Sequence, residues 1–386
     1  MFINFWYPAV TGAELTADKP IRVQMLGHWL VLFRDSAGVA RCLADTCVHR
    51  GGALGLGRIR RGHVECPYHG WQFDGEGRCQ AIPSLGPEAR IPPRAKVDSY
   101  PVQEKYGLVF AFLGDLPEAQ RPPLMPIPEY ETPGWRANLI IFDIHCNYER
   151  SIENGLDPGH NEFVHPSQGF EGERADYRVP ELEIEDQQWG SGFMSVFRGR
   201  ERANLPTRTA MRTDAEGRFD PDVSAGTWHH GPAQMVTKIH MARTNWMHQY
   251  MFECPVDEDR VKVYLVNMRN CLLDEEKDAK VVERCLVVAN QDIAVLEKMQ
   301  PVTTPRSATL EILMPADGPI ARYRQWLRGW TDRGWRLDIA GIRSARAERD
   351  VVFAIPSPAR ATEKNWVLDP VPLVPGTGAP VTVQER

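Results

Sequence analysis

The spacing of apolar and polar residues divides the chain into two regions with different expected structures. Up to about Gly114, short apolar runs such as 29–33 and 107–112 are bounded by turn residues, which is typical of an all-β region. The segment that follows, 115–134, carries six prolines. Because proline at this density cannot continue a helix or a central strand, we expect one domain at 1–115, a linker at 116–135 and a second domain at 136–386.

After the linker, the sequence pattern predicts a sheet first, and long helices only further along the chain. Residues 138–146 read as a strand, and 148–163 read as a helix that is interrupted at Asp157-Pro158-Gly159. Residues 234–270 alternate apolar and polar side chains around a hairpin-like break at 255–259. This alternation predicts antiparallel strands.

Two helices and an extended tail are expected after that sheet. Residues 274–299 carry an apolar stripe at helical spacing, and 321–334 predict a second, more basic helix. The proline-rich tail after Pro356 favours an extended chain. The expected fold class is therefore α+β: an N-terminal all-β domain, followed by an antiparallel-sheet domain with helices on one side.

Composition and charge narrow the range of functions. The 386 residues carry a formal net charge of −6, which argues against nucleic acid as the main partner because phosphate binding needs a basic surface. Residues 1–10 have no basic start and contain a proline, so no signal peptide is expected. The longest apolar runs are strand-sized, which argues against a membrane span. Eight cysteines without a secretory signal favour reduced thiols or metal ligands in a cytoplasmic protein.

Two cysteine–histidine pairs are the strongest chemical signal. Cys47-Val48-His49 and Cys66-Pro67-Tyr68-His69 both lie in glycine-rich surroundings. Two thiolates and two imidazoles on paired loops suit an iron–sulfur centre in which one iron takes both cysteines and the other both histidines. A structural zinc site is the alternative, although Cys-x-His is a poor match to the usual zinc spacing.

A second motif, D-x-x-H-x-x-x-x-H, contains Asp157, His160 and His165. Histidines five apart do not share a face of a straight helix, so a joint is needed, with Asp157 as a helix cap and Pro158 at the first helical position. Two imidazoles and one carboxylate form a facial triad for ferrous iron. Asp292, on an otherwise apolar helix, is the expected carboxylate; the alternatives are a solvated Asp292 with Glu297 or Glu153 as the ligand.

Together, the two motifs resemble the oxygenase component (alpha subunit) of the Rieske non-haem iron oxygenases, and in particular its homotrimeric demethylase- and phthalate-type members. The resemblance extends from about Trp6 to about Asp338. For the [2Fe–2S] cluster, the resemblance implies that Cys47 and Cys66 bind the inner iron. His49 and His69 would bind the outer iron.

The resemblance also assigns roles at the second motif. It implies that mononuclear Fe(II) is bound by His160, His165 and Asp292. Asp157 would link His160 to the outer-iron histidine, His69, of a neighbouring subunit in a homotrimer. Asn154 matches a position that lies near the iron in several members of the family.

The function expected from the resemblance is O2-dependent monooxygenation of an aromatic or small apolar substrate, by hydroxylation or by oxidative O- or N-demethylation. Electrons would come from NAD(P)H through a separate reductase or a ferredoxin, because no nucleotide-binding glycine motif follows a strand in this chain. Ring cis-dihydroxylation is the alternative reaction. An electron-transfer protein with an inactive second site is an alternative from another class.

Overall fold

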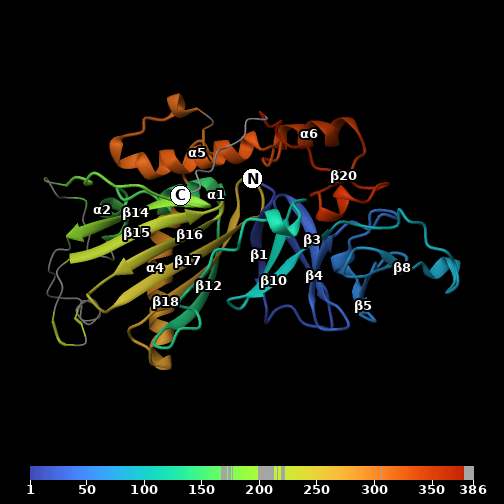
Figure 1. Cartoon of the computed structure of the whole chain (residues 1–386), viewed down its shortest axis with the longest axis horizontal. Helices are drawn as coiled ribbons and strands as arrows, with labels where there is room; N and C mark the ends of the chain where they lie inside the picture. Colours follow the sequence, from blue (N-terminus) through green and yellow to red (C-terminus); the bar gives the residue numbers. More distant parts are fainter. Residues whose placement is uncertain are drawn as a thin grey trace. The chain divides into compact units, whose positions relative to one another are not determined.

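The computed structural model describes residues 1–166, 172, 175, 177–198, 213–214, 216–218, 222–305 and 307–377. These residues form two compact units. The first comprises Met1–Leu124 together with the chain from Gly329 onward, and the second comprises Met125–Arg328. Figure 1 labels the helices and strands of both units.

The first unit is built mainly from three small antiparallel sheets. One has the order β1-β11-β10, with β1 Phe5–Thr11, β10 Val102–Lys105 and β11 Leu108–Leu113. The next has the order β2-β3-β4-β9, with β2 Ile21–Met25, β3 His28–Arg34, β4 Ala40–Ala44 and β9 Ser99–Tyr100. The last has the order β5-β6-β7-β8, with β5 Arg58–Arg60, β6 His63–Glu65, β7 Gln72–Phe73 and β8 Cys79–Ala81.

Local sequence explains how these strands are joined and packed. All six side chains of β11 are buried, as its uninterrupted apolar run indicates. Lys105 pairs with Leu108 across a two-residue turn, Tyr106-Gly107, in which both residues have positive φ (57° and 76°). Such a turn matches the twist of an antiparallel hairpin, and it accounts for the abrupt reversal between β10 and β11.

The chain returns to the first unit near its C-terminal end. This segment contains α6 (Ile339–Glu348) and a short parallel pair of strands, β19 (Phe353–Ala354) and β20 (Asp369–Pro370). Asp98, which is fully buried, accepts hydrogen bonds from Arg360 Nε and Nη2 at 2.6 and 2.7 Å and from Ser357 Oγ at 2.8 Å. A buried carboxylate that is paired in this way fixes the returning segment against the N-terminal strands.

A seven-stranded antiparallel sheet forms the second unit, in the order β12-β18-β17-β16-β15-β14-β13. Its strands are β12 Arg136–Ile144, β13 Glu185–Gln187, β14 Gly190–Arg198, β15 Asp222–His230, β16 Gln234–His240, β17 Trp246–Pro255 and β18 Val261–Arg269. Its helices are α1 Tyr148–Gly155, α2 Asn161–Val164, α4 Asp278–Leu296 and α5 Gly318–Asp332, the last of which crosses the division between the units at Gly329.

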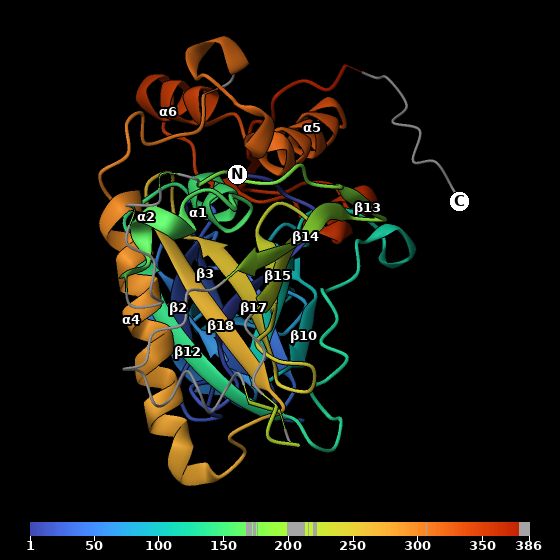
Figure 2. The same ribbon diagram turned by 90° about the vertical axis from the view of Figure 1, so that its left-hand side faces the viewer.

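Helix α4 covers one face of this sheet, and Figure 2 shows it running along β12 and β18. Val281 and Cys285 of the helix pack against Ile140 of β12 and Leu265 of β18. These four residues are buried, so the apolar stripe of the helix and the alternating strands share one core.

The expected α+β class is confirmed, and so are the antiparallel strands of 234–270 and the interrupted helix at the second metal motif. The helix expected at 274–299 is also confirmed, as α4 over Asp278–Leu296. The units differ from the expected division of the sequence, because the chain from Gly329 onward groups with the N-terminal strands. No helix in the described part of the chain is both long and apolar enough to cross a membrane.

Candidate functional site

The two cysteine–histidine pairs lie on loops with the same backbone pattern. In one loop, Gly51 N–H donates to Cys47 O at 2.9 Å, and in the other, Gly70 N–H donates to Cys66 O at 3.0 Å. Both glycines have φ near +72°, a conformation that favours glycine over other residues. The glycines beside each pair therefore give the two loops equivalent turns.

The side chains on these loops form a group suited to a mixed-ligand cluster. Cys47 and Cys66 are buried, whereas His49 and His69 are exposed, and the two imidazole rings lie 4.4 Å apart. Burial raises the pKa of the Cys47 thiol, so the bare thiolate is disfavoured there without a cation. A [2Fe–2S] cluster with its cysteine iron inward and its histidine iron at the surface fits this arrangement.

The second motif is carried by two short helices and the joint between them. Helix α1 ends at Gly155, and α2 begins at Asn161. The expectation that Asp157 caps the second helix is wrong: the residue at the N-cap is His160, without a side-chain cap. Asp157 Oδ1 instead accepts a hydrogen bond from Gly159 N–H at 2.6 Å, which forms a tight turn inside the joint.

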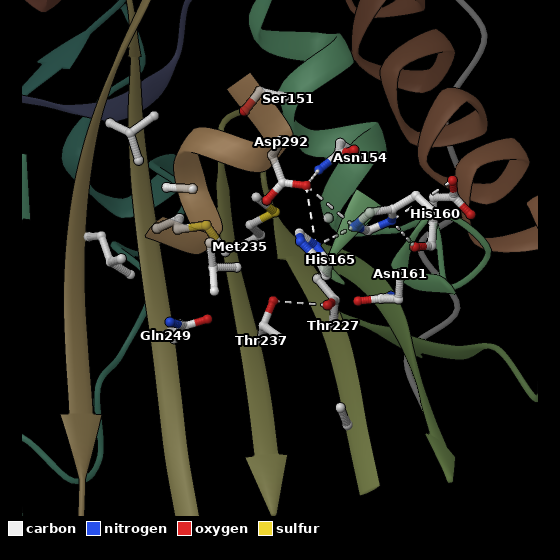
Figure 3. A pocket seen from close by; sticks show the side chains of 18 of the residues that line it. Ser151, Asn154, His160, Asn161, His165, Thr227, Met235, Thr237, Gln249 and Asp292 are labelled. Atoms are coloured by element: carbon white, nitrogen blue, oxygen red, sulfur yellow. Dashed lines mark hydrogen bonds and ion pairs between the residues drawn. The ribbon is translucent and has the colours of Figure 1, made fainter. Parts of the chain in front are cut away.

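This joint brings together the residues that the sequence predicts as ligands. His160 Nε2 lies 3.2 Å from His165 Nε2, and Asp292 Oδ1 of α4 lies 3.5 and 3.4 Å from those two atoms. Figure 3 shows the three side chains pointing toward one another. Within the described ranges, these residues are the group of three whose geometry suits one metal ion.

Hydrogen bonds at the far side of each ring support a cation between them. His160 Nδ1 donates to Asp157 O at 2.6 Å, and His165 Nδ1 donates to Gln291 Oε1 at 3.1 Å. With each Nδ1 proton held by an oxygen, a neutral ring presents its Nε2 lone pair to the centre. Burial and the neighbouring His160 lower the pKa of His165, which favours this neutral form. Two lone pairs and a carboxylate oxygen that converge in this way fit ferrous iron.

Asn154 and Asp157 lie around this group in different ways. Asn154 Nδ2 donates to Asp292 Oδ1 at 3.1 Å, so its side chain orients the carboxylate. The Asp157 side chain is 29% exposed, and its Oδ2 lies 3.9 Å from His160 Nδ1. Asp157 therefore contacts His160 chiefly through its backbone and keeps part of its carboxylate open to solvent.

The alternative ligands have other partners. Glu153 pairs with Arg324 at 2.6 Å, and Glu297 Oε1 accepts a hydrogen bond from His145 N–H. Two histidines of the large sheet also have partners of their own: His229 bonds Ser191 Oγ and Gly231 O, and His248 bonds Glu129. Sequence reasoning did not identify Gln291, which orients His165. Its only signal is its position beside Asp292, because a metal-binding histidine needs an acceptor for its second nitrogen.

The three converging residues open on a cavity of about 220 Å³. Its walls come from α1, α4, the joint that carries the two histidines and the strands β12 and β14–β18, and they are mostly apolar. The apolar lining includes Phe142, Ile144, Met235, Ile239, Met251, Val263, Leu265 and Val288. Ser151 of α1 also reaches this wall, where its hydroxyl donates to Glu253 Oε1 at 2.7 Å. A small, largely apolar molecule can therefore lie beside the candidate metal centre.

Comparison with known proteins identifies the class. Residues 5–101 match the Rieske [2Fe-2S] domain, and residues 144–333 match the vanillate O-demethylase oxygenase C-terminal domain. The chain belongs to the Rieske non-haem iron oxygenases, as a catalytic alpha subunit. It is an enzyme of that class, with a C-terminal domain of the vanillate demethylase type.

Two curated relatives illustrate the similarity in sequence. The chain is 35% identical over 166 residues to the 3-chlorobenzoate-3,4-dioxygenase oxygenase subunit of Comamonas testosteroni, a match over 42% of this chain and 37% of the relative. It is 28% identical over 198 residues to a 5,5'-dehydrodivanillate O-demethylase oxygenase subunit of a Sphingobium species, over 49% and 45% of the two chains. These matches span less than half the length of either relative.

Solved structures resemble the chain over more of its length. The structure of NdmA from Pseudomonas putida CBB5 with caffeine has a TM-score of 0.69 and 25% identity, and the match covers 84% of this chain and 90% of that one. Dicamba monooxygenase bound to dicamba has a TM-score of 0.65 and 21% identity, with 90% and 98% covered, which shows the shared fold.

Proposed function

We propose that this chain is the oxygenase component of a multicomponent system that carries out O2-dependent monooxygenation of a small aromatic or apolar compound. The reaction is hydroxylation or oxidative O- or N-demethylation. The observation that carries the proposal is the convergence of His160, His165 and Asp292 on a mostly apolar cavity. When bound, the cluster supplies single electrons and ferrous iron supplies the chemistry of oxygen activation.

The chain's own residues hold and orient these groups. Cys47, His49, Cys66 and His69 bind the cluster in the proposal, and His160, His165 and Asp292 bind the mononuclear iron. Asn154 holds the Asp292 carboxylate, and Gln291 holds the His165 ring. The apolar walls exclude water from the substrate's reacting carbon, which limits side reactions.

The proposed route for electrons runs between subunits of a homotrimer. Asp157 would join His160 to His69 of the partner subunit, and a cytoplasmic NAD(P)H-dependent reductase or ferredoxin would reduce the cluster. Two features support this route: His69 is exposed at the end of its loop, and the Asp157 carboxylate is partly open to solvent beside His160. A carboxylate between two imidazoles can accept a hydrogen bond from each.

Support for monooxygenation comes from the relatives. Similar proteins include a named O-demethylase and a named 4beta-methylsterol monooxygenase, although another is a named dioxygenase. The test supplies the purified chain with a reductase, NADH, labelled O2 and methoxylated aromatics. We expect substrate-dependent formaldehyde formed with one labelled oxygen atom, a phenol that keeps its unlabelled ether oxygen, and the second labelled atom in water. A cis-diol with two labelled atoms would replace the proposal with ring dihydroxylation.

A further inference from the structure

A row of uncharged polar side chains crosses the pocket face of the sheet. Thr227 of β15 lies opposite Thr237 of β16, Thr237 lies opposite Gln249 of β17, and Gln249 lies opposite Asn267 of β18. Residues directly opposite in neighbouring strands point to the same face. We call these four residues the polar row.

Mostly apolar residues flank the row. Met235, Met251 and Leu265 occupy the next register position in one direction, beside His229 of β15. Ala225, Ile239 and Met247 occupy it in the other direction, beside Arg269 of β18. Thr227, Thr237 and Gln249 line the cavity, and in Figure 3 they run from below His165 to the far side of the pocket. The row therefore begins beside the candidate metal centre and leads away from it.

The polar row has hydrogen-bonding capacity that the described protein does not use. The Thr227 and Thr237 hydroxyls bond each other at 2.9 Å, whereas Gln249 Nε2 reaches only Cys285 Sγ, at 3.7 Å. Asn267 is fully buried, and neither its Nδ2 nor its Oδ1 has a partner among the described residues. Asn267 does not line the cavity, whereas the half-buried Gln249 does. A polar group from a ligand or a water is therefore expected beside the Gln249 amide.

The charges around the cavity indicate what kind of polar group this is. Its described lining holds no lysine or arginine; its acidic side chains are Asp157, Glu253 and Asp292, and its histidines are the two of the metal centre. A bound divalent cation would offset Asp292, but at the opposite end of the row from Gln249. The cation nearest to the row, Arg269 of β18, is buried and already paired with Asp278. A carboxylate beside Gln249 would therefore lose its water without an unpaired cation to meet it, which is costly. A hydroxyl, carbonyl or amide group would meet matching donors and acceptors.

The volume of the cavity limits the size of the molecule. At about 220 Å³ it exceeds the cavity of about 150 Å³ that holds benzene in an engineered protein. The extra space suits substituents on one ring or a compact fused pair of rings.

We propose that the polar row selects an uncharged aromatic or heteroaromatic substrate of one ring or a fused pair. Its hydroxyl, carbonyl or amide group bonds Gln249, and its methyl-bearing edge faces His160 and His165. This inference rests on the proposed function, because it concerns the substrate of the same site.

The test compares two probes that differ by one carboxylate: guaiacol, a neutral methoxyphenol, and vanillate, its carboxylated form. Binding to the iron-loaded protein is measured by calorimetry without oxygen or reductant. We expect guaiacol to bind at least about tenfold more tightly than vanillate, and caffeine to bind more tightly than dicamba. Equal or tighter binding of the carboxylates, or no binding of either neutral probe, would overturn the proposal.

Variants of Gln249 distinguish ligand binding by the polar row from ligand binding by the apolar lining of the cavity. Gln249→Leu should weaken guaiacol binding about tenfold, and Gln249→Lys should shift the preference toward vanillate by supplying a cation. Gln187→Leu, the same change on exposed β13, should leave both affinities unchanged. If Gln249→Leu binds guaiacol as the wild type does, only water uses the row and the proposal fails. Because no turnover is measured, a protein that selects guaiacol but forms no formaldehyde would contradict the proposed reaction alone.

Discussion

The side chain of Glu253, on β17, places a carboxyl group in the wall of the pocket. It is almost completely buried, and its Oε2 has no partner among the described residues. Burial raises its pKa from 4.5 to about 8, and the hydrogen bond from Ser151 opposes this only in part. The side chain is therefore a neutral acid at neutral pH, which limits the negative charge around the cavity.

This raised pKa makes the stability of the fold dependent on pH. Between pH 4.5 and about 8 the unfolded chain releases the Glu253 proton and the folded chain keeps it, so stability falls as pH rises. The loss is at most about 1.4 kcal/mol per pH unit. Glu253→Gln should flatten this dependence. Urea unfolding of both proteins at about pH 5.5 and about pH 8 measures it, and equal slopes would contradict the assignment.

Asp157 is the residue on which the proposed route between subunits depends. Asp157→Asn keeps the size of the side chain and an oxygen that can accept from Gly159 N–H, but it removes the charge. Both metal sites should stay loaded, while coupled turnover should fall about 100-fold. Iron and sulfide analysis gives the loading, and single-turnover reoxidation of the cluster gives the coupling. Normal turnover would remove Asp157 from the route.

The sequence identifies the charged and metal-binding residues better than the neutral ones around them. Cys47, His49, Cys66, His69, His160 and His165 follow from spacing and residue type. Asp292 is 127 residues beyond His165, and only a carboxylate among apolar neighbours indicates it as a ligand. Gln291 and Gln249 gave no comparable signal, because a glutamine is common at helix and strand surfaces alike. Their importance follows from contacts that only the folded chain creates.

Helix α1 is held in place by four charged side chains. Arg324 of α5 bonds Glu153 at 2.6 and 2.9 Å and Glu311 at 2.7 Å, and Arg150 bonds Glu311 at 2.7 Å. Glu153 and Arg150 are almost completely buried. Since Asn154 follows Glu153 directly on α1, this network also positions the side chain that holds Asp292.

Removing one member of the network should leave a buried charge without its partner. Arg324→Met should lower stability by about 3–5 kcal/mol and should reduce the mononuclear iron content. Arg322→Met, on the same helix, removes a more exposed pair with Asp186 and should cost less than about 1 kcal/mol. Chemical unfolding and iron analysis measure both variants. Equal losses of stability and of iron in the two variants would show that the network around Arg324 is not specifically required for the metal site.

At the level of elements, the sequence patterns predict four of the seven strands of the large sheet, β12 and β16–β18. The strands β16, β17 and β18 and the helix α4 have clear apolar periods, whereas β14 and β15 contain glycines that weaken the pattern. At Gly226, an added Cβ would lie 2.1 Å from Phe193 O, so close strand packing requires glycine there. The pairing of Asp98 with Arg360, 262 residues apart, has no local signal.

The whole molecule should contain two separate iron sites. Analysis of the purified protein should give about three irons and two sulfides per chain, because the cluster contributes two irons and the triad one. His160→Ala should lower the iron content by about one and leave the cluster spectrum unchanged. About two irons in the wild type, with no further uptake on anaerobic addition of Fe(II), would favour an electron carrier whose second site is empty.

The alignment of Thr227, Thr237, Gln249 and Asn267 across four strands has a consequence for how new specificities can arise. Because the positions are far apart in the chain but adjacent in the sheet, independent point mutations can change them without altering any loop length. Inserting or deleting one residue in β16 would turn Thr237 away from the ligand and bury its neighbour instead. A combinatorial library limited to these positions should thus yield altered ligand preference while the fold survives.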